Sequence, residues 1–357
     1  MPRRSPFSAP VPVVRSTAIS QPVADLKPEH IAGLKDAAAH AKAANSSRAY
    51  RSQLKLFSVW LRDNAYPPPP WDVAAPLRTA VAPRLVAAWL KTRADAGAAR
   101  ATLNVAAAAV SYGHIVTGQR FDRADPALTE TMRGTRRMIL REVRQASPLR
   151  ASLLTALLER LGDGPADRRA AAILGSLYAL ALRRSELAGL DWDRHGAGTG
   201  VLRLTVEALE VVLLTSKGSQ ESAASVRIPR VAIPRIATAL DQWIAAADVA
   251  PGTPLLRQLT RTGKPTAKRL SGAGINTSLK SVLTRHGAAV GLTADEIAGF
   301  SGHSGRVGFI VTAKEAGAED SDVAETTRHK SLEMVRHYGK KASQTRRAAH
   351  RIDGVGV

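Results

Sequence analysis

The stretch Ser301-Gly302-His303-Ser304-Gly305-Arg306-Val307-Gly308 decides how the rest of the chain is interpreted. Its histidine and arginine stand three residues apart, which places both side chains on one face of a helix that begins here. Gly302 and Gly308 allow a ligand to approach the backbone closely. A guanidinium is a planar fork of donors that suits a phosphate group, and an imidazole can hydrogen-bond to it or move a proton. The stretch therefore predicts a helix start that handles a phosphate.

Two further segments carry side chains of the same kinds. Arg183 is followed three residues later by Glu186, on the same helix face, where the carboxylate can orient an arginine or a histidine. His329 is followed nine residues later by Tyr338, whose neighbours are cationic. A phenol has a pKa of about 10 and becomes a nucleophile near neutral pH only with cationic help and a proton acceptor. Taken singly, each segment also fits a surface ion pair or a half-buried aromatic residue.

In the order Arg, His-x-x-Arg, His, Tyr, these residues resemble the tyrosine site-specific recombinases, also called the phage integrase family. The stretch 301–308 is most similar to the Cre branch of that family. The resemblance implies a mostly α fold with a small antiparallel sheet, in which an all-helical core-binding domain precedes an α+β catalytic domain. It also implies cleavage and rejoining of duplex DNA through a 3′-phosphotyrosyl intermediate, with no cofactor and no metal.

The resemblance assigns a role to each residue of the expected catalytic site. Tyr338 is the nucleophile, Arg183 and Arg306 clamp the phosphate, Glu186 orients a neighbour, and His303 handles protons. His329 belongs to the same set, although Thr327-Arg328 precedes it where many relatives have Leu-Gly. Metal binding by His329 and His337 is an alternative, but no carboxylate or cysteine stands at ligand spacing.

Lys217 stands in Thr215-Ser216-Lys217-Gly218-Ser219, a turn signal between two predicted strands. The commoner use of such a lysine is to keep a turn soluble. The family places its general-acid lysine on this hairpin, so the resemblance implies that Lys217 protonates the departing 5′ oxygen.

Composition points to a polyanionic partner. The chain has 357 residues, enough for two domains, and 51 lysines and arginines against 30 acidic residues give a net charge of +21. It has no cysteine and no apolar run long enough to span a membrane. The start, Met1-Pro2-Arg3-Arg4, lacks the apolar core of a secretion signal, although it could mimic an organellar transit peptide. We expect a cytoplasmic, nucleoid-associated protein.

The hydrophobic pattern predicts four parts: a disordered tail (1–27), a helical DNA-binding domain (28–134), a basic linker (135–150) and a catalytic domain with a C-terminal helix (151–357). In the first domain, Ser46 or Ser47 caps a helix, and further helices follow Pro83 and span 98–116. In the second, helices at 151–162 and 166–182 precede strands at 201–206, 209–214 and 226–228, and helices resume at Pro234.

Basic residues outside the expected catalytic site predict the DNA contacts. These are Arg48, Arg51 and Lys55 in the first domain; Arg133, Arg136, Arg137 and Arg141 in the linker; and Arg257, Arg261, Lys264, Lys268 and Arg269 in a loop bounded by Pro254 and Gly272. A solvated surface is the ordinary alternative. The expected partners are double-stranded DNA with inverted-repeat sites and, on synapsed DNA, three further copies in a homo-tetramer. Accessory proteins are not predictable.

Two other functions fit the same residues. A topoisomerase IB-like or resolvase enzyme would cut and reseal DNA without bringing two sites together. A non-catalytic DNA-binding protein could keep the same fold. Neither is distinguished from a recombinase by sequence alone.

Overall fold

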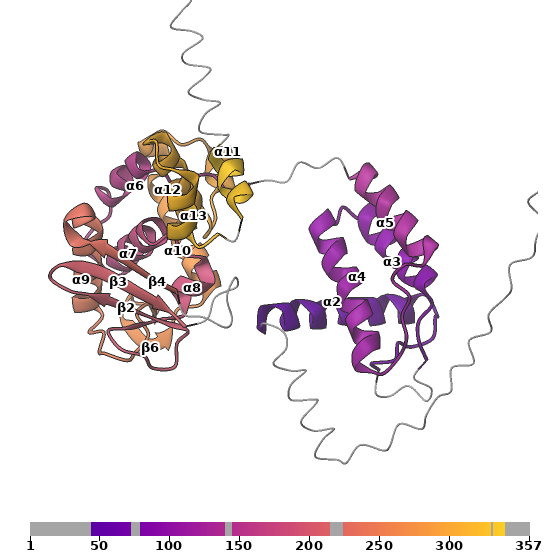
Figure 1. The fold of residues 1–357 in the computed structure, drawn as a ribbon. Coiled ribbons are helices and arrows are strands. Elements are labelled where there is room, and N and C mark those ends of the chain that lie inside the picture. Colours follow the sequence, from indigo (N-terminus) through magenta and orange to yellow (C-terminus); the bar gives the residue numbers. More distant parts are fainter. Residues whose placement is uncertain (1–43, 73–78, 140–144, 215–223, 330, 340–357) are drawn as a thin grey trace, which may run out of the picture. The chain divides into compact units, whose positions relative to one another are not determined.

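The computed structural model describes residues 44–72, 79–139, 145–214, 224–329 and 331–339. The chain divides into two units between Arg141 and Glu142 (Figure 1). The predicted tail, residues 1–27, and the expected C-terminal helix lie outside the described residues. No helix in the described part of the chain is long and apolar enough to cross a membrane.

The first unit is all-helical where it is described, as predicted. Its helices are α2 (Ala44–Asp63), α3 (Pro83–Asp95), α4 (Arg100–Val116) and α5 (Pro126–Met138). Helix α2 packs on α4, and α3 packs on both α4 and α5. Phe57 and Leu61 of α2 are fully buried with Trp89 and Leu90 of α3. Helix α2 begins at Ala44, so the predicted cap at Ser46 or Ser47 is wrong.

The start of the predicted linker is instead the end of helix α5. Asp125 caps this helix by accepting a hydrogen bond from the amide of Ala127, and Pro126 occupies its first position. Leu128 and Thr135 are buried, so the helix packs against its own unit through these two positions. The arginine run hid this period from sequence analysis, and residues 135–138 belong to a helix rather than to a linker.

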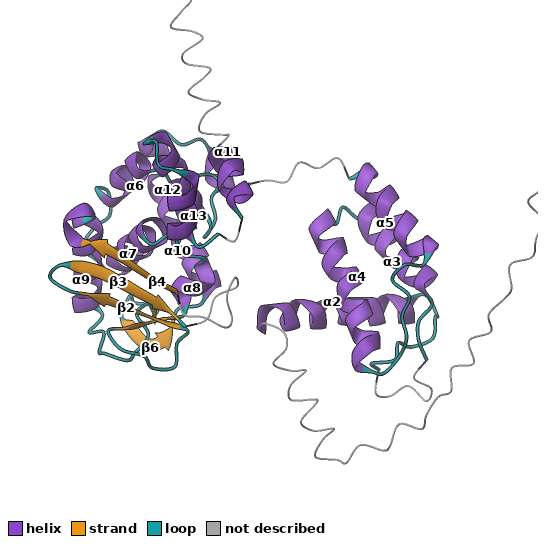
Figure 2. Ribbon diagram, in the orientation of Figure 1, coloured by secondary structure: helices purple, strands orange, loops and turns teal. Residues whose placement is uncertain are grey.

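The second unit combines helices with two small sheets (Figure 2). Helices α6 (Ala151–Leu158), α7 (Pro165–Ala179) and α8 (Arg184–Ala188) come first. After the strands come α9 (Pro234–Ala246), α10 (Gly272–His286), α11 (Ala294–Gly299), α12 (Ser304–Glu315) and α13 (Asp320–Thr327). Short 3₁₀ turns, η1 (Arg230–Ala232) and η2 (Ala288–Val290), precede α9 and α11. A last helical stretch covers 332–339.

The main sheet has the order β1-β2-β3-β4, with β1 (Leu190–Trp192), β2 (Gly200–Leu204), β3 (Ala208–Leu213) and β4 (Ala224–Pro229). Strands β2 to β4 confirm the three predicted strands. Strand β1 pairs with β2 in parallel, so this sheet is mixed rather than antiparallel as predicted. Strand β1 has only three residues and follows a short helix, so its alternation of apolar and polar residues is too brief to be recognised in the sequence.

A second sheet was missed by sequence analysis. Strands β5 (Arg257–Leu259) and β6 (Pro265–Arg269) form an antiparallel hairpin where a basic loop was expected. Both strands are short and polar, so the two-residue apolar period that reveals a strand is absent.

Helix α7 lies at the centre of the second unit, because it contacts α9, α10 and α12. Ile173, Leu174 and Leu177 of α7 are fully buried and join the main hydrophobic core, which extends to Leu202 and Leu209 of the sheet. Figure 2 shows the strands at one end of the unit and α6, α12 and α13 at the other. The packing of α12 on α7 brings the residues on α12 next to the loop that follows α7.

Candidate active site

Arg183 and Glu186 meet where α7 gives way to α8. The Nη1 atom of Arg183 donates to Oε1 of Glu186 at 2.6 Å, and the backbone amide of Arg183 donates to Oε2 at 2.8 Å. The Glu186 side chain is only 4% exposed. The carboxylate therefore holds both the backbone and the guanidinium of Arg183 at the start of α8, on one turn as the spacing predicted.

Arg306 is buried completely, in the first turn of α12. Its Nη1 atom donates to the carbonyl oxygen of Ala181 at 2.8 Å, while Nε and Nη2 have no hydrogen-bond partner among the described residues. His303 is the residue immediately before this helix, which confirms that the pair shares a helix start. Two unsatisfied, buried donors on a charged group are costly, and an anion would satisfy them.

The glycines of α12 serve packing rather than ligand approach. A Cβ atom on Gly308 would lie 1.8 Å from the carbonyl oxygen of Leu149, and one on Gly305 would lie 2.7 Å from backbone of Leu177. A Cβ atom on Gly302 would meet the side chain of Arg184 at 2.7 Å. The interpretation of Gly302 and Gly308 as openings for a ligand is therefore wrong. Gly305 lets α12 lie close to Leu177 of α7, and Gly308 lets it lie against the backbone of Leu149.

The end of α13 supplies His329 and its supports. The Oγ1 atom of Thr327 donates to the carbonyl oxygen of Val323 at 2.5 Å and lies 2.6 Å from Nδ1 of His329. A hydroxyl has one proton, so Thr327 accepts from Nδ1–H of His329 while it donates to Val323. The ring nitrogen Nε2 of the neutral imidazole is then left as an acceptor.

Tyr338 lies in the helical stretch 332–339 and is half-buried. Its ring packs near Val307 and Val311 of α12, and its centroid is 6.5 Å from that of His303. Burial raises the pKa of Tyr338, while the positive charge of Arg306 acts to lower it. In the free protein, desolvation therefore outweighs the charge.

Burial is also the largest cause of the pKa shifts of Arg306, His303 and His329. Burial, then the charges of Arg183 and Arg328, lowers the pKa of Arg306 to about 9. Burial and the charges of Arg306 and Arg183 lower the pKa of His303. Burial and four cationic neighbours, Arg306 first, lower the pKa of His329 to about 4. Each of these shifts disfavours positive charge, which is the signature of a site crowded with cations.

The structure thus brings together six of the seven residues predicted for the catalytic site; Lys217 lies outside the described residues. Sequence analysis missed Arg328, whose side chain is 11% exposed and whose Nη2 atom lies 3.5 Å from Oε2 of Glu186. The signal was an arginine at a helix end where many relatives have glycine. We call Arg183, Arg306, Arg328 and Glu186 the arginine cluster.

The predicted DNA-contacting residues fall into two groups. Arg48, Arg51 and Lys55 of α2, Arg133, Arg136 and Arg137 of α5, and Arg261, Lys264 and Lys268 of the β5–β6 hairpin have exposed side chains. Arg133 pairs with Glu130 at 2.6 Å. Arg141 lies outside the described residues.

Arg257 and Arg269 instead have structural partners. Arg257 donates to the carbonyl oxygen of Ala247 at 3.2 Å and to Oγ1 of Thr253 at 2.7 Å. Arg269 pairs with the fully buried Asp191 and donates to the carbonyl oxygen of Leu190 at 2.9 Å. Their guanidinium groups fix the hairpin to the rest of the unit, and their contact with DNA stays a prediction.

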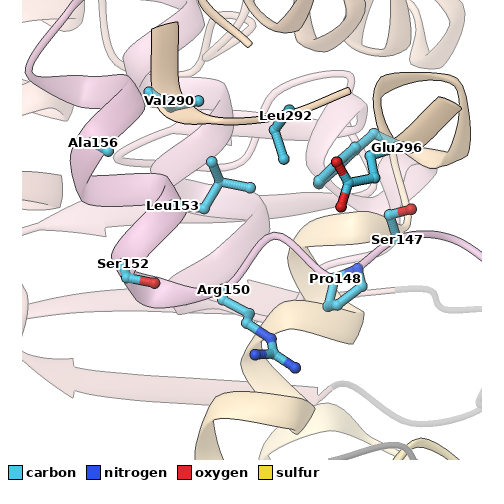
Figure 3. Close-up of a pocket in the computed structure, with 10 residues that line it drawn as sticks. Ser147, Pro148, Arg150, Ser152, Leu153, Ala156, Val290, Leu292 and Glu296 are labelled. Atoms are coloured by element: carbon cyan, nitrogen blue, oxygen red, sulfur yellow. The ribbon is translucent and has the colours of Figure 1, made fainter. Parts of the chain in front are cut away.

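A groove of about 590 Å³ lies elsewhere on the second unit. Leu153 and Ala156 of α6, with Val290 and Leu292, form its apolar sides, and Glu296 lies beside Ser147 at one end (Figure 3). The arginine cluster does not contribute to its lining. The groove is therefore separate from the candidate active site.

Known proteins share both the sequence pattern and the fold of this chain. The family described as "Phage integrase family" matches residues 148–345. An integrase/recombinase XerD homolog from Selenomonas ruminantium is 27% identical over 306 residues, which cover 83% of this chain and 82% of that protein.

Two solved structures share the fold. The Tn1549 transposon integrase, in complex with transposon right end DNA, has a TM-score of 0.53 at 14% identity and covers 86% of this chain and 95% of its own. The XerH site-specific recombinase, bound to a palindromic difH substrate, has a TM-score of 0.50 at 14% identity, with coverage of 76% and 72%. The family match spans more than half of the 357 residues and includes the arginine cluster, both histidines and Tyr338. The chain therefore belongs to the phage integrase family, the tyrosine recombinases.

Proposed function

We propose that this recombinase cleaves and rejoins DNA through a covalent bond between Tyr338 and a 3′ phosphate. One observation carries the assignment of residues: Arg183 and Arg306 converge on the loop at Ala181, beside His303, whose ring lies 6.5 Å from that of Tyr338. A buried cluster with more cations than carboxylates is unfavourable until an anion occupies it. A phosphodiester is an anion of the required charge and shape.

The cleavage step follows from these positions. The phenolic oxygen of Tyr338 attacks the phosphorus, so the P–Oη bond forms and the bond to the 5′ oxygen breaks. Arg183 and the two free donors of Arg306 stabilise the charge on the pentacoordinate transition state, usually the largest catalytic contribution. The attack requires loss of the phenolic proton, and neutral His303 or His329 can accept it.

We assign the general-acid step to Lys217 because of the family resemblance. It protonates the departing 5′ oxygen and leaves a free 5′ hydroxyl. A 5′ hydroxyl from a partner strand then attacks the phosphotyrosyl bond and releases Tyr338, so the bond energy is conserved and no nucleotide is consumed.

The DNA partner is a duplex whose recombination site is an inverted repeat, bound by four copies of the chain. XerH is seen on a palindromic substrate, and its fold is that of this chain, which supports a site of the same symmetry. The exposed cations on α2, α5 and the β5–β6 hairpin are suited to phosphate contacts, which position the protein without reading sequence.

Covalent trapping tests the function directly. A library of nicked duplexes is made from the DNA of the native host, so that cleavage releases a short fragment that carries the free 5′ hydroxyl. The library is incubated with the protein, and protein–DNA adducts are isolated and sequenced. We expect adducts at a narrow set of inverted repeats, lost in Tyr338→Phe and retained in the control Tyr66→Phe, which changes a partly exposed tyrosine of the first unit. Adducts that persist in Tyr338→Phe, or none with the parent protein, would overturn the proposal.

A plasmid carrying one recovered site separates a recombinase from a topoisomerase. Relaxation of supercoils by one site, without exchange when a second site is supplied, would mean that the enzyme cuts and reseals without synapsis. Exchange between two sites, with four copies bound, supports the recombinase.

A further inference from the structure

Arg328 has a backbone conformation that does not suit an arginine. It follows the last residue of α13 with φ 55° and ψ 46°, in the left-handed region. This is the position at a helix end where glycine is favoured, because a Cβ atom is strained there. Folding alone would be better served by glycine, so the arginine side chain must contribute something that offsets the strain.

The guanidinium of Arg328 reaches the two groups that hold the phosphate-clamping arginines. Its Nη2 atom donates to the carbonyl oxygen of Ala181 at 3.2 Å, the same oxygen that accepts from Arg306. It also lies 3.5 Å from Oε2 of Glu186, the carboxylate that holds Arg183. One side chain therefore contacts the anchor of each clamping arginine.

The same residue connects these anchors to His329. Arg328 immediately precedes His329, and the helix end that it forms lets the amide of His329 donate to the carbonyl oxygen of Ala324 at 2.9 Å. Ala181 is itself left-handed, with φ 45°, so two strained backbones meet where Arg328 spans them. Loss of the guanidinium would free the end of α13 from the loop that carries Arg183.

We propose that Arg328 is a positioning residue of the recombination reaction, which fixes Arg183, Arg306 and His329 in one arrangement and adds a third positive charge around the phosphate. The proposal rests on the proposed function of the arginine cluster. It differs from a purely structural role because Arg328 shares the single carboxylate of Glu186 with Arg183, so the arginine cluster keeps a net positive charge.

The variant Arg328→Gly tests this, because it relieves backbone strain while removing the guanidinium. Asp248→Gly is the matched control: Asp248 is also left-handed, with φ 45°, and its side chain is exposed far along the chain from the arginine cluster. On the DNA fragment recovered by covalent trapping, we expect Arg328→Gly to bind within about threefold of the parent. Its rate of adduct formation at saturating DNA should fall by about 10–100-fold, the range for lost electrostatic stabilisation and alignment. Arg328→Lys should keep part of the parental rate of adduct formation, and Asp248→Gly should keep all of it.

A second measurement keeps this proposal separate from the proposed function. Inorganic phosphate is titrated calorimetrically into the parent, Arg328→Gly, Tyr338→Phe, and Arg261→Gly, which removes an exposed arginine of the β5–β6 turn. Weaker phosphate binding in Arg328→Gly alone supports the positioning role, even if no DNA adduct forms. Equal phosphate affinity in Arg328→Gly and the parent, or an unchanged adduct rate, would overturn it.

Discussion

Arg183 and Glu186 are joined twice, through the guanidinium at 2.6 Å and through the backbone amide at 2.8 Å, around a carboxylate that is almost entirely buried. Arg328 approaches the same carboxylate from the end of α13. One negative charge thus contacts two guanidinium groups that would otherwise repel one another, and its field also favours the charged form of Arg306. The phosphate that we propose for this site would replace repulsion with attraction, so we expect the cluster to be more stable when it is occupied.

We expect Glu186→Gln to destabilise the free protein by about 3 kcal/mol, because it leaves buried arginines without their carboxylate. The glutamine keeps the shape of the side chain, so the loss reports charge. Urea unfolding measures it. The control is Glu130→Gln, which breaks an exposed pair of the same spacing with Arg133 and should cost less than about 0.5 kcal/mol. Equal losses in the two variants would show that Glu186 does not organise the cluster.

Stability should fall as pH drops from about 6.5 to about 4, partly through His329. Its pKa is lowered to about 4 in the folded protein, whereas the unfolded chain takes up a proton near 6.5. The unfolded state therefore binds more protons in this window, so the contribution of His329 to stability is complete above the window and is lost within it. We expect the melting temperature to fall less in His329→Gln than in the parent when the pH drops from about 7.5 to about 5.

The control for this experiment is His195→Gln, which changes an exposed histidine in the loop between β1 and β2. This variant should keep the pH dependence of the parent. His303 remains in all three proteins and contributes a part of the slope in the same direction, because its pKa is also lowered. Identical slopes in the parent and His329→Gln would contradict the assigned environment of His329.

Gly308→Ala should prevent stable folding of the second unit, because the added Cβ would lie 1.8 Å from the carbonyl oxygen of Leu149. Overpacking against backbone cannot be relieved by a rotamer change, and we expect a loss of about 3 kcal/mol or more. Gly134→Ala in α5 is the control, since its Cβ would meet nothing within 4 Å. That variant should gain up to about 1 kcal/mol from helix propensity. Thermal unfolding followed by circular dichroism measures both, and a well-folded Gly308→Ala would contradict the packing of α12 against the backbone of Leu149.

The order of these residues along the chain was enough to predict the catalytic unit and most of its site, because Arg183, His303, Arg306 and Tyr338 carry chemistry that recurs at fixed spacing. Local pattern could not reveal Arg328, since its importance depends on Ala181 and Glu186, which are distant in sequence. The same limit applied to strand β1, which is too short to show a period. It also applied to the end of α5, where a run of arginines covers the apolar positions Leu128 and Met132.

Lys268 and Arg269 are adjacent on β6, and the sequence predicted the same role for both, but their surroundings differ. Lys268 is exposed, whereas Arg269 donates to the carbonyl oxygens of Ala188 and Leu190 and pairs with buried Asp191. Burial alone would raise the pKa of Asp191, but hydrogen bonds from Arg269 and two glycine amides lower it overall. The carboxylate is therefore charged and depends on Arg269.

We expect Arg269→Met to cost about 3 kcal/mol in urea unfolding, because it leaves Asp191 charged and unpaired in the interior. Lys268→Met should leave stability unchanged and instead weaken binding to duplex DNA of arbitrary sequence. If Lys268 contacts one phosphate, the slope of log affinity against log salt should fall by about 0.9. Titrations over a range of salt measure this slope. An unchanged slope in Lys268→Met would place this end of the hairpin away from DNA, and a stable Arg269→Met would mean that Asp191 finds its partners elsewhere.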